Sequence, residues 1–207
     1  MKKIEQKFIK YCDENELIVK GDKILVALSG GPDSVFLLSI LFKYKNRFDI
    51  EIGAFHLNHN IRGRSADLDE EFCKSLCEVK EIKFFKKSRN VKIFAEENHY
   101  SLEEAGRKIR YEELNRTAKK NNYNKIATAH NSDDNAETVF LNLIKGAGLQ
   151  GISGIPPKRE NIIRPILSVS NEEIINSKID SKIALIYDFE SMASFRIQRQ
   201  SFLMDYK

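Results

Sequence analysis

Two adjacent glycines interrupt the chain between an apolar run and a helical pattern, within the segment Ser29-Gly30-Gly31-Pro32-Asp33-Ser34. Glycines let the backbone turn tightly, and a helix that begins there offers unpaired N–H donors and the positive end of its dipole to an anion. No lysine follows the glycines, which excludes the loop that serves γ-phosphoryl transfer from ATP. The segment predicts a phosphate site flanked by the hydroxyls of Ser29 and Ser34 and the carboxylate of Asp33. The alternative is an ordinary strand-to-helix turn.

A second polar cluster follows another apolar run and contains His130 and three acidic residues. Acidic side chains at the start of a helix are often only partners of its dipole, which is the interpretation preferred for Asp133. Asp134 and Glu137 differ because they share one helix face near His130. Carboxylate oxygens suit Mg²⁺, so we expect Asp134 to help Asp33 hold the Mg²⁺ that accompanies a nucleoside triphosphate.

Two arginines, Arg107 and Arg110, lie on one face of a predicted helix. Taken alone, they are more often surface charges. A guanidinium that reaches the phosphates would stabilise the charge that develops as pyrophosphate leaves, which a lysine does less well.

Two other motifs are rejected. A zinc site at His56, His59 and His130 lacks a fourth ligand at suitable spacing. The segment 146–151 matches G-x-G-x-x-G, but a helix precedes it where a dinucleotide site needs a strand. We interpret it as a helix end followed by a loop of close backbone approach.

Four apolar runs of β type alternate with helical patterns. The expected strands are Ile24–Leu28, Ile50–Leu57, Ile82–Phe85 and Lys125–Ala129, and the expected helices are Val35–Phe42, Leu68–Val79 and Leu102–Ala118. This alternation predicts an α/β fold with a doubly wound, Rossmann-like parallel sheet. Ligands bind at the carboxyl ends of such strands, so the polar clusters should converge at one edge of the sheet. A short final strand is expected at 162–167, at an edge because of Pro165.

Local patterns give further expectations for the helices. Asp67-x-x-Glu70 and Ser101-x-x-Glu104 resemble capping boxes. One apolar face is predicted for each of two helices, formed in the first by Leu68, Phe72, Leu76 and Val79, and in the second by Ala136, Val139, Phe140, Leu143 and Ile144. Ser170-x-x-Glu173 could cap one helical turn, and 183–187 could form a short strand.

Composition limits the class of protein. The 207 residues suit one α/β domain, and the net charge of +4 fits a phosphate-bearing partner without identifying one. The three cysteines lack C-x-x-C spacing; Cys73 and Cys77 are expected to line the core, which favours a reducing, cytoplasmic location. We expect no membrane partner, because no apolar run is long enough to cross a bilayer.

The motifs resemble those of one family. The segment 29–34 resembles the signature of N-type ATP pyrophosphatases. Together with 56–62, 104–111, 129–138, 146–154 and 164–167, it looks like the catalytic domain of the tRNA(Ile)-lysidine synthetases. The resemblance covers about residues 20–170. It implies a PP-loop catalytic domain at 1–167, followed by a short atypical tail at 168–207.

The resemblance implies a two-step reaction on the wobble cytidine of the CAU anticodon of tRNA(Ile), in which ATP adenylates the base and free lysine then displaces AMP. A second copy of the chain is a further candidate partner. The catalytic residues expected from the motifs are Asp33, Arg110, His130 and Asp134. ATP would contact Ser29, Gly30, Gly31, Pro32, Asp33, Ser34, His56 and Asn58, and the other substrates would contact His59, Arg62, Arg107 and Glu137.

The region after Leu167 departs from the family, because it contains little of the pattern of the domains that grip tRNA. Two alternatives therefore stay open. The first is another PP-loop tRNA-modifying enzyme, such as a thiolase, although thiolases generally depend on paired cysteines. The second is a nucleotide-binding remnant without activity on tRNA.

Overall fold

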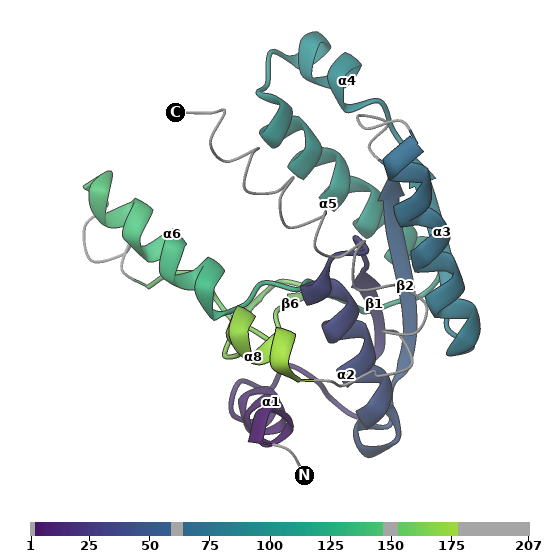
Figure 1. The fold of residues 1–207 in the computed structure, drawn as a ribbon, viewed down its shortest axis with the longest axis vertical. Helices are drawn as coiled ribbons and strands as arrows, with labels where there is room; N and C mark the ends of the chain where they lie inside the picture. The colour runs from purple at the N-terminus through teal and green to yellow at the C-terminus, as the bar shows by residue number, and fades with distance from the viewer. Residues whose placement is uncertain (1–2, 59–63, 147–152, 178–207) are drawn as a thin grey trace. The chain divides into compact units, whose positions relative to one another are not determined.

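A twisted sheet lies at the centre of the molecule (Figure 1). The computed structural model describes residues 3–58, 64–146 and 153–177. Within these ranges the sheet has six strands in the order β3-β2-β1-β4-β6-β5, and all pair in parallel except β5, which runs antiparallel to β6 at one edge. The strands are β1 (Lys23–Ala27), β2 (Glu51–Asn58), β3 (Lys83–Ser88), β4 (Lys125–Ala127), β5 (Lys158–Arg159) and β6 (Ile162–Ile163). The predicted doubly wound α/β fold is confirmed.

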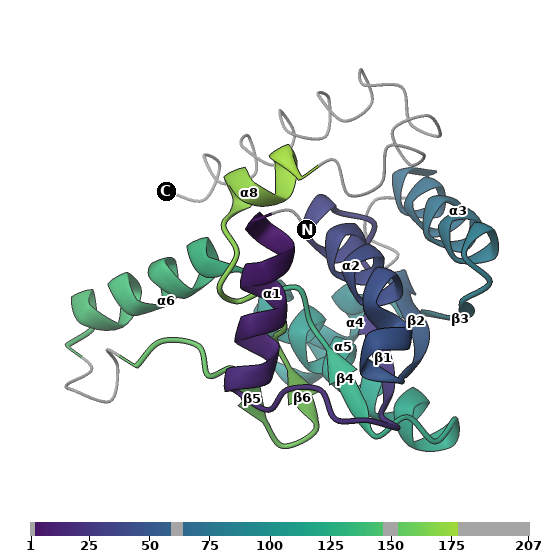
Figure 2. The same cartoon turned by 90° about the horizontal axis from the view of Figure 1, so that it is seen from below.

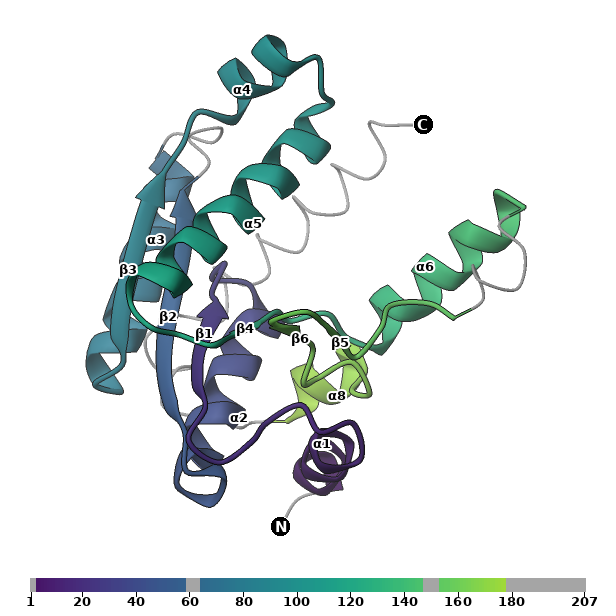
Figure 3. The same cartoon turned by 180° about the vertical axis from the view of Figure 1, so that it is seen from behind.

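Helices cover both faces of the sheet, as opposite views show (Figures 1 and 3). One face carries α2 (Pro32–Phe48) and α3 (Arg64–Val79), and the other carries α5 (Leu102–Lys120), with α4 (Val91–Asn98) packed against α5. The alternation of side chains along β1 explains both layers, because Leu25 joins the core under α5 while its neighbours Ile24 and Val26 are buried on the opposite face.

The core under α5 joins strands that are distant in sequence. Leu25, Phe55 and Ile126 come from three adjacent strands and pack with Ile109 and Leu114 of α5. Tyr123 closes this core near Gly53, where an added Cβ would lie 2.3 Å from the tyrosine hydroxyl oxygen. Gly53 is therefore required by close approach, since any larger side chain would displace Tyr123 or the strand.

Two further helices pack beside α2 (Figure 2). The first is α1 (Lys3–Glu14), which buries Phe8 and Cys12 at i and i+4. The second is the short α8 (Asn171–Asn176), which begins with the predicted Ser170–Glu173 capping box. The spacing of Ile4, Phe8 and Cys12 was the sequence signal for α1, a helix absent from the expectations above.

The predicted buried face of the helix after His130 is wrong. This helix, α6 (Ser132–Ile144), extends away from the sheet (Figure 3) and has no buried residue. Phe140 is 63% exposed and Ile144 is 67% exposed. Periodicity correctly predicted a helix, but it cannot tell whether another element covers the apolar side.

Several local expectations need correction. The Asp67–Glu70 capping box is wrong, because α3 begins at Arg64 and Asp67 lies in its first turn. Phe72 and Leu76 are buried as expected, whereas Leu68 and Val79 at either end of that face are exposed. The last parallel strand is also shorter than predicted and is not at an edge.

That strand, β6, spans Ile162–Ile163 between β4 and β5. Pro165 lies in the turn beyond it, so proline does not restrict the position of the strand. The possible strand at 183–187 lies outside the described residues.

Two local expectations are confirmed, the capping box of α5 and the burial of Cys73 and Cys77. Ser101 and Glu104 form a complete capping box at the start of α5. Cys12, Cys73 and Cys77 are all buried and free. No helix in the described ranges has the length and apolar character needed to cross a membrane.

Candidate functional site

The glycine loop forms a tight hydrogen-bonded turn between β1 and α2. Gly30 has a φ of +88°, in the left-handed region that glycine adopts without strain. The Ser34 hydroxyl donates to the carbonyl of Gly31 at 2.9 Å and accepts from the backbone N–H of Ser29 at 3.2 Å. Ser34 therefore sets the shape of the loop from inside, where it is buried.

The start of α2 is suited to an anion. Gly31 is the N-cap and brings no side-chain oxygen to the first turn, and Pro32 occupies the first helical position. Asp33 lies in the same turn and is partly buried. The loop thus presents a helix N-terminus, which favours phosphate, with one carboxylate beside it.

His56 and Asn58 on β2 are each only 4% exposed. The Nδ1 of His56 lies 2.9 Å from the carbonyl oxygen of Leu28, and because a carbonyl can only accept, Nδ1 carries the proton. Asn58 donates to the carboxylate of Asp67 at 3.2 Å. These contacts tie β2 to the end of β1 and to α3. Direct binding of ATP by the two side chains stays a prediction.

His130 follows β4 and is held by a residue that the sequence analysis did not select. The Oγ1 of Thr128 lies 3.0 Å from the Nδ1 of His130, and the backbone N–H of Thr128 donates to the carbonyl of Ile163 at 3.0 Å. The imidazole is thereby fixed to the carboxyl end of the sheet.

The acidic residues after His130 cap helices. Asn131 is the N-cap of α6 and accepts from the backbone N–H groups of Asp133 and Asp134, while Asp134 Oδ2 accepts from the N–H of Asn131 at 3.0 Å. One oxygen of Asp134 is thus engaged by its own helix. The N-cap role of Asn131 could have been inferred from an Asn placed three residues before an acidic residue.

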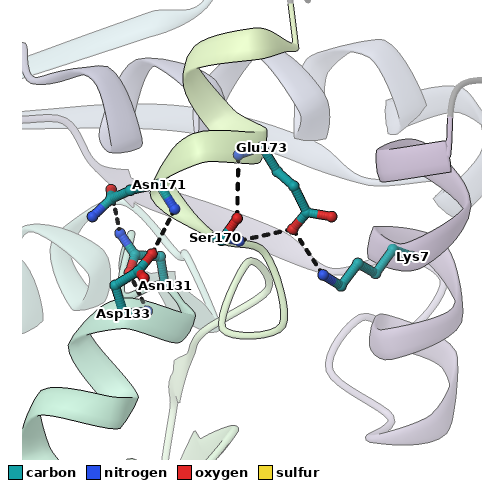
Figure 4. Close-up of polar contacts among 6 residues, drawn as sticks. All are labelled: Lys7, Asn131, Asp133, Ser170, Asn171 and Glu173. Carbon is teal, nitrogen blue, oxygen red and sulfur yellow. Dashed lines mark hydrogen bonds and ion pairs between the residues drawn. The ribbon is translucent and has the colours of Figure 1, made fainter.

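A chain of polar contacts fixes the start of α6 to α8 and α1 (Figure 4). Asp133 accepts from the backbone N–H of Asn171 at 2.6 Å, and the amide of Asn131 donates to the side-chain oxygen of Asn171 at 2.9 Å. Glu173 then pairs with Lys7 of α1 at 2.7 Å. Asp133 therefore has a structural role at the starts of α6 and α8, in line with its interpretation as a partner of the helix dipole.

The charges of three arginines act on His130. Burial lowers the pKa of His130, the charges of Arg164, Arg107 and Arg110 lower it further, and the charge of Asp134 opposes them. The charges of three other predicted site residues, Asp134, Arg107 and Arg110, therefore act on His130. The charge of Arg164 acts on His130 as well. Arg164 belongs to the motif at 164–167, but the sequence analysis gave it no role.

Two of these arginines lack carboxylate partners in the described part of the chain. Arg164 is buried and donates through Nη1 to the carbonyl of Pro156 at 2.7 Å, and its Nε is buried without a partner there. Arg110 has surface area on α5, but enough protein surrounds its guanidinium for desolvation to lower its pKa, with Tyr111 opposing the shift and Arg107 adding to it. Such groups are available to an anionic ligand.

The other predicted substrate-binding residues are exposed or lie outside the described residues. Arg107 is exposed and stacks near Tyr111, with its guanidinium 5.9 Å from the ring centroid. Glu137 is exposed on α6, one turn beyond Asp134. His59 and Arg62 lie outside the described residues.

Mg²⁺ needs few protein ligands when phosphates supply the others, because it often takes only one or two carboxylates. Within the described ranges no group of three or more His, Cys, Asp or Glu side chains could hold a metal. Asp33 lies beside the phosphate loop and can supply one carboxylate ligand. Asp134 can supply a second ligand through the oxygen that does not accept from the N–H of Asn131. This donor set is compatible with a metal that arrives bound to a nucleotide.

The order of the strands explains why the site lies where it does. The chain builds β1, β2 and β3 outward in one direction and then returns to place β4 on the other side of β1. Doubly wound sheets bind ligands at this switch point, at the carboxyl ends of the strands. The glycine loop leaves β1 and the His130 turn leaves β4, so both flank the switch point.

The sheet and its glycine loop have the arrangement of a PP-loop domain, and comparison with known proteins agrees. The chain matches the PP-loop domain family over residues 1–202 and belongs to that family of ATP-binding domains. The predicted family resemblance is confirmed.

Similar curated proteins include three tRNA(Ile)-lysidine synthases. That of Clostridioides difficile is 49% identical over 172 residues, covering 83% of this chain and 37% of the relative. That of Clostridium acetobutylicum is 44% identical, with 84% and 38% covered, and that of Thermosipho africanus is 42% identical, with 88% and 43% covered. The chain thus spans less than half the length of these relatives.

Solved structures share the fold at lower identity. The U34-tRNA thiolase NcsA of Methanococcus maripaludis superposes with a TM-score of 0.65 at 22% identity, covering 87% of this chain and 62% of that protein. An NH3-dependent NAD synthetase of Campylobacter jejuni gives 0.57 at 16% identity, covering 100% and 89%. At these identities the likeness establishes the Rossmann-like fold alone.

Proposed function

We propose that this chain binds ATP and uses it to join lysine to C2 of the wobble cytidine in the CAU anticodon of tRNA(Ile). The observation that carries the proposal is the placement of the glycine loop and the His130 turn on either side of the strand-order switch, with His130, Asp134, Arg107, Arg110 and Arg164 in one electrostatic neighbourhood. The names of the curated relatives support the choice of substrates.

The first step is adenylation of the base. The cytidine O2 attacks the α-phosphorus of ATP, the bond to the β-phosphate bridging oxygen breaks, and pyrophosphate leaves. The helix N-terminus at 31–34 holds the phosphates, and Arg110 stabilises the charge that grows on the leaving group. If Mg²⁺ is bound with the nucleotide, Asp33 and Asp134 would hold it, and it would neutralise part of the phosphate charge.

The second step needs a base. The ammonium group of free lysine has a pKa of about 10.4, so exposing its lone pair at neutral pH costs roughly 4–5 kcal/mol. The amine attacks C2 of the adenylated base, AMP leaves with the bonding electrons, and a proton passes to a nearby acceptor. We assign that role to His130, because burial and the surrounding arginines keep its imidazole neutral at physiological pH.

The cysteines weigh against the thiolase alternative. Sulfur delivery relies on accessible thiolates, whereas all three cysteines of this chain are buried. Burial raises the pKa of Cys77 to about 12 and also raises the pKa of Cys12 and Cys73. These side chains are suited to core packing rather than to sulfur transfer.

The experiment is a measurement of AMP release from ATP with unmodified tRNA(Ile) carrying the CAU anticodon, with and without lysine. We expect AMP release that requires this tRNA and increases with lysine, and little release with a tRNA(Ile) carrying a GAU anticodon. Because the chain spans less than half of its relatives, a second arm supplies the remaining region of a relative. ATP binding without AMP release in both arms would identify a nucleotide-binding remnant and overturn the proposal.

A further inference from the structure

The hydrogen bond between Thr128 and His130 has the properties of a fixed support. Thr128 is 6% exposed, and its β-branched side chain has little freedom about χ1. Its backbone is held by the N–H bond to Ile163, so its hydroxyl has a set position at the end of the sheet. The imidazole of His130 at 3.0 Å must orient to suit that hydroxyl.

The direction of this hydrogen bond decides which ring nitrogen is available. A neutral imidazole has one N–H donor and one acceptor nitrogen, and a hydroxyl can serve either. If the hydroxyl donated to Nδ1, the acceptor nitrogen would be occupied and Nε2 would carry the proton. If Nδ1–H donates to the hydroxyl, Nε2 is the acceptor, and within the described ranges Nε2 has no hydrogen-bond partner.

The arginines around the ring cannot accept a hydrogen bond from it, and Asp134 makes no hydrogen bond to it within the described ranges. Arg107, Arg110 and Arg164 are donors only, and the charge of Asp134 is the negative contribution at His130. One oxygen of Asp134 already accepts from the N–H of Asn131. Thr128 is thus the recorded hydrogen-bond partner of the imidazole, and it can accept from Nδ1–H both before and after the ring gains a proton.

We infer that Thr128 is a positioning residue that holds His130 in the Nδ1–H tautomer, so that Nε2 faces the reacting groups as the proton acceptor. The inference rests on the proposed function of His130. In the lysine step, the proton leaves the ammonium nitrogen, binds Nε2, and leaves a lone pair for attack on C2. The resulting imidazolium keeps its hydrogen bond from Nδ1–H to the hydroxyl of Thr128.

Two variants separate the hydroxyl from the shape of the side chain. Thr128→Val keeps the branched shape and removes the hydrogen-bond acceptor, whereas Thr128→Ser keeps the hydroxyl. The tautomer of each histidine is visible in a long-range ¹H–¹⁵N NMR spectrum of the ¹⁵N-labelled chain, recorded well above the ordinary histidine pKa. His130→Gln assigns the His130 signals among the four histidines of the chain.

The chain also contains internal references. His56 must carry its proton on Nδ1, because that atom faces a carbonyl oxygen. His99 lies exposed at the end of α4. We expect His130 to give the same pattern as His56 in the parent chain and in Thr128→Ser. In Thr128→Val it should move toward the Nε2–H form that exposed histidines favour.

An Nε2–H pattern for His130 in the parent chain would overturn the inference, as would a Thr128→Val spectrum identical to that of the parent. Should Thr128→Val fail to fold, the parent spectrum alone decides. The measurement needs neither tRNA nor turnover, so its failure is distinct from failure of the AMP-release experiment. If turnover is measurable, Thr128→Val should slow the lysine-dependent step about tenfold, and Thr128→Ser should restore most of the rate.

Discussion

Val26 of β1 and Ala127 of β4 are register partners in the parallel sheet. Ser29 lies three residues beyond the first and His130 three residues beyond the second. The phosphate loop and the candidate base therefore leave neighbouring strands at matching positions. Because two parallel strands in fixed register carry them, their spacing depends on backbone hydrogen bonds rather than on flexible loops.

Replacement of Asp33 by Asn should abolish adenylation of the base while leaving the fold intact. The change removes a negatively charged oxygen beside the phosphate loop, and loss of metal-assisted charge stabilisation is worth several kcal/mol, or about 100-fold or more in rate. Titration calorimetry with Mg-ATP and a single-turnover assay measure the two effects. Asp49→Asn, at the opposite end of α2, is the matched control. Unchanged AMP production in Asp33→Asn would remove this residue from the site.

Replacement of Arg110 by Lys should be damaging although the charge is kept. A lysine ammonium cannot reproduce the planar donor pair that a guanidinium offers to a leaving pyrophosphate. We expect a loss of about tenfold or more in the adenylation rate, consistent with loss of a charged hydrogen bond. Arg107→Lys on the same helix is the comparison. An equal effect of the two substitutions would contradict the choice of Arg110 over Arg107.

The lowered pKa of His130 predicts a pH-dependent contribution to stability. Burial is the largest cause, and the charge of Arg164 is the next. The unfolded chain binds this proton near the ordinary pKa of about 6.5, whereas the folded chain binds it only at lower pH, so stability falls as pH drops from above about 6.5 toward the folded pKa. Urea unfolding of the parent and His130→Gln at a series of pH values measures the difference. The parent should lose more stability than the variant across this window, and parallel curves would contradict the pKa direction.

The exposed apolar side chains of α6 should contribute little to the stability of this chain. Phe140→Ser or Ile144→Ser is expected to change the free energy of unfolding by less than about 0.5 kcal/mol, as is usual at surface positions. Leu37→Ala in the core of α2 should cost about 2–5 kcal/mol. Denaturant unfolding compares the three variants. A loss of several kcal/mol at Phe140 would mean that another part of the chain covers this face.

The sequence predicted the parts of the fold that depend on local pattern. Strand–helix alternation gave the parallel sheet, and the two glycines gave the turn into α2. It did not predict which apolar faces are covered, as Phe140 and Ile144 show, because covering depends on elements distant in sequence.

In the candidate site, too, the sequence predicted what depends on residue type and motif but not what depends on contacts between distant residues. His130, Asp134 and Arg110 were recognisable from residue type and motif, and in the fold the charges of Asp134 and Arg110 act on His130. Thr128 and Asn171 were missed, because their roles come from contacts with His130 and with the start of α6, and nothing in their immediate sequence indicates those contacts.

Replacement of Asn131 by Ala tests the fixed start of α6. Asn131 is 1% exposed, caps two backbone N–H groups of α6 and donates to Asn171, so its loss should cost about 1–2 kcal/mol, at the upper end for a helix cap. Ser101→Ala, which removes the exposed cap of α5, should cost about 0.5–1 kcal/mol. Hydrogen exchange provides the decisive comparison: the first-turn amides of α6 should lose protection in Asn131→Ala and keep it in Ser101→Ala. Full protection of those amides in Asn131→Ala would show that the contact between Asp133 and Asn171 holds the His130–Asp134 turn without the cap.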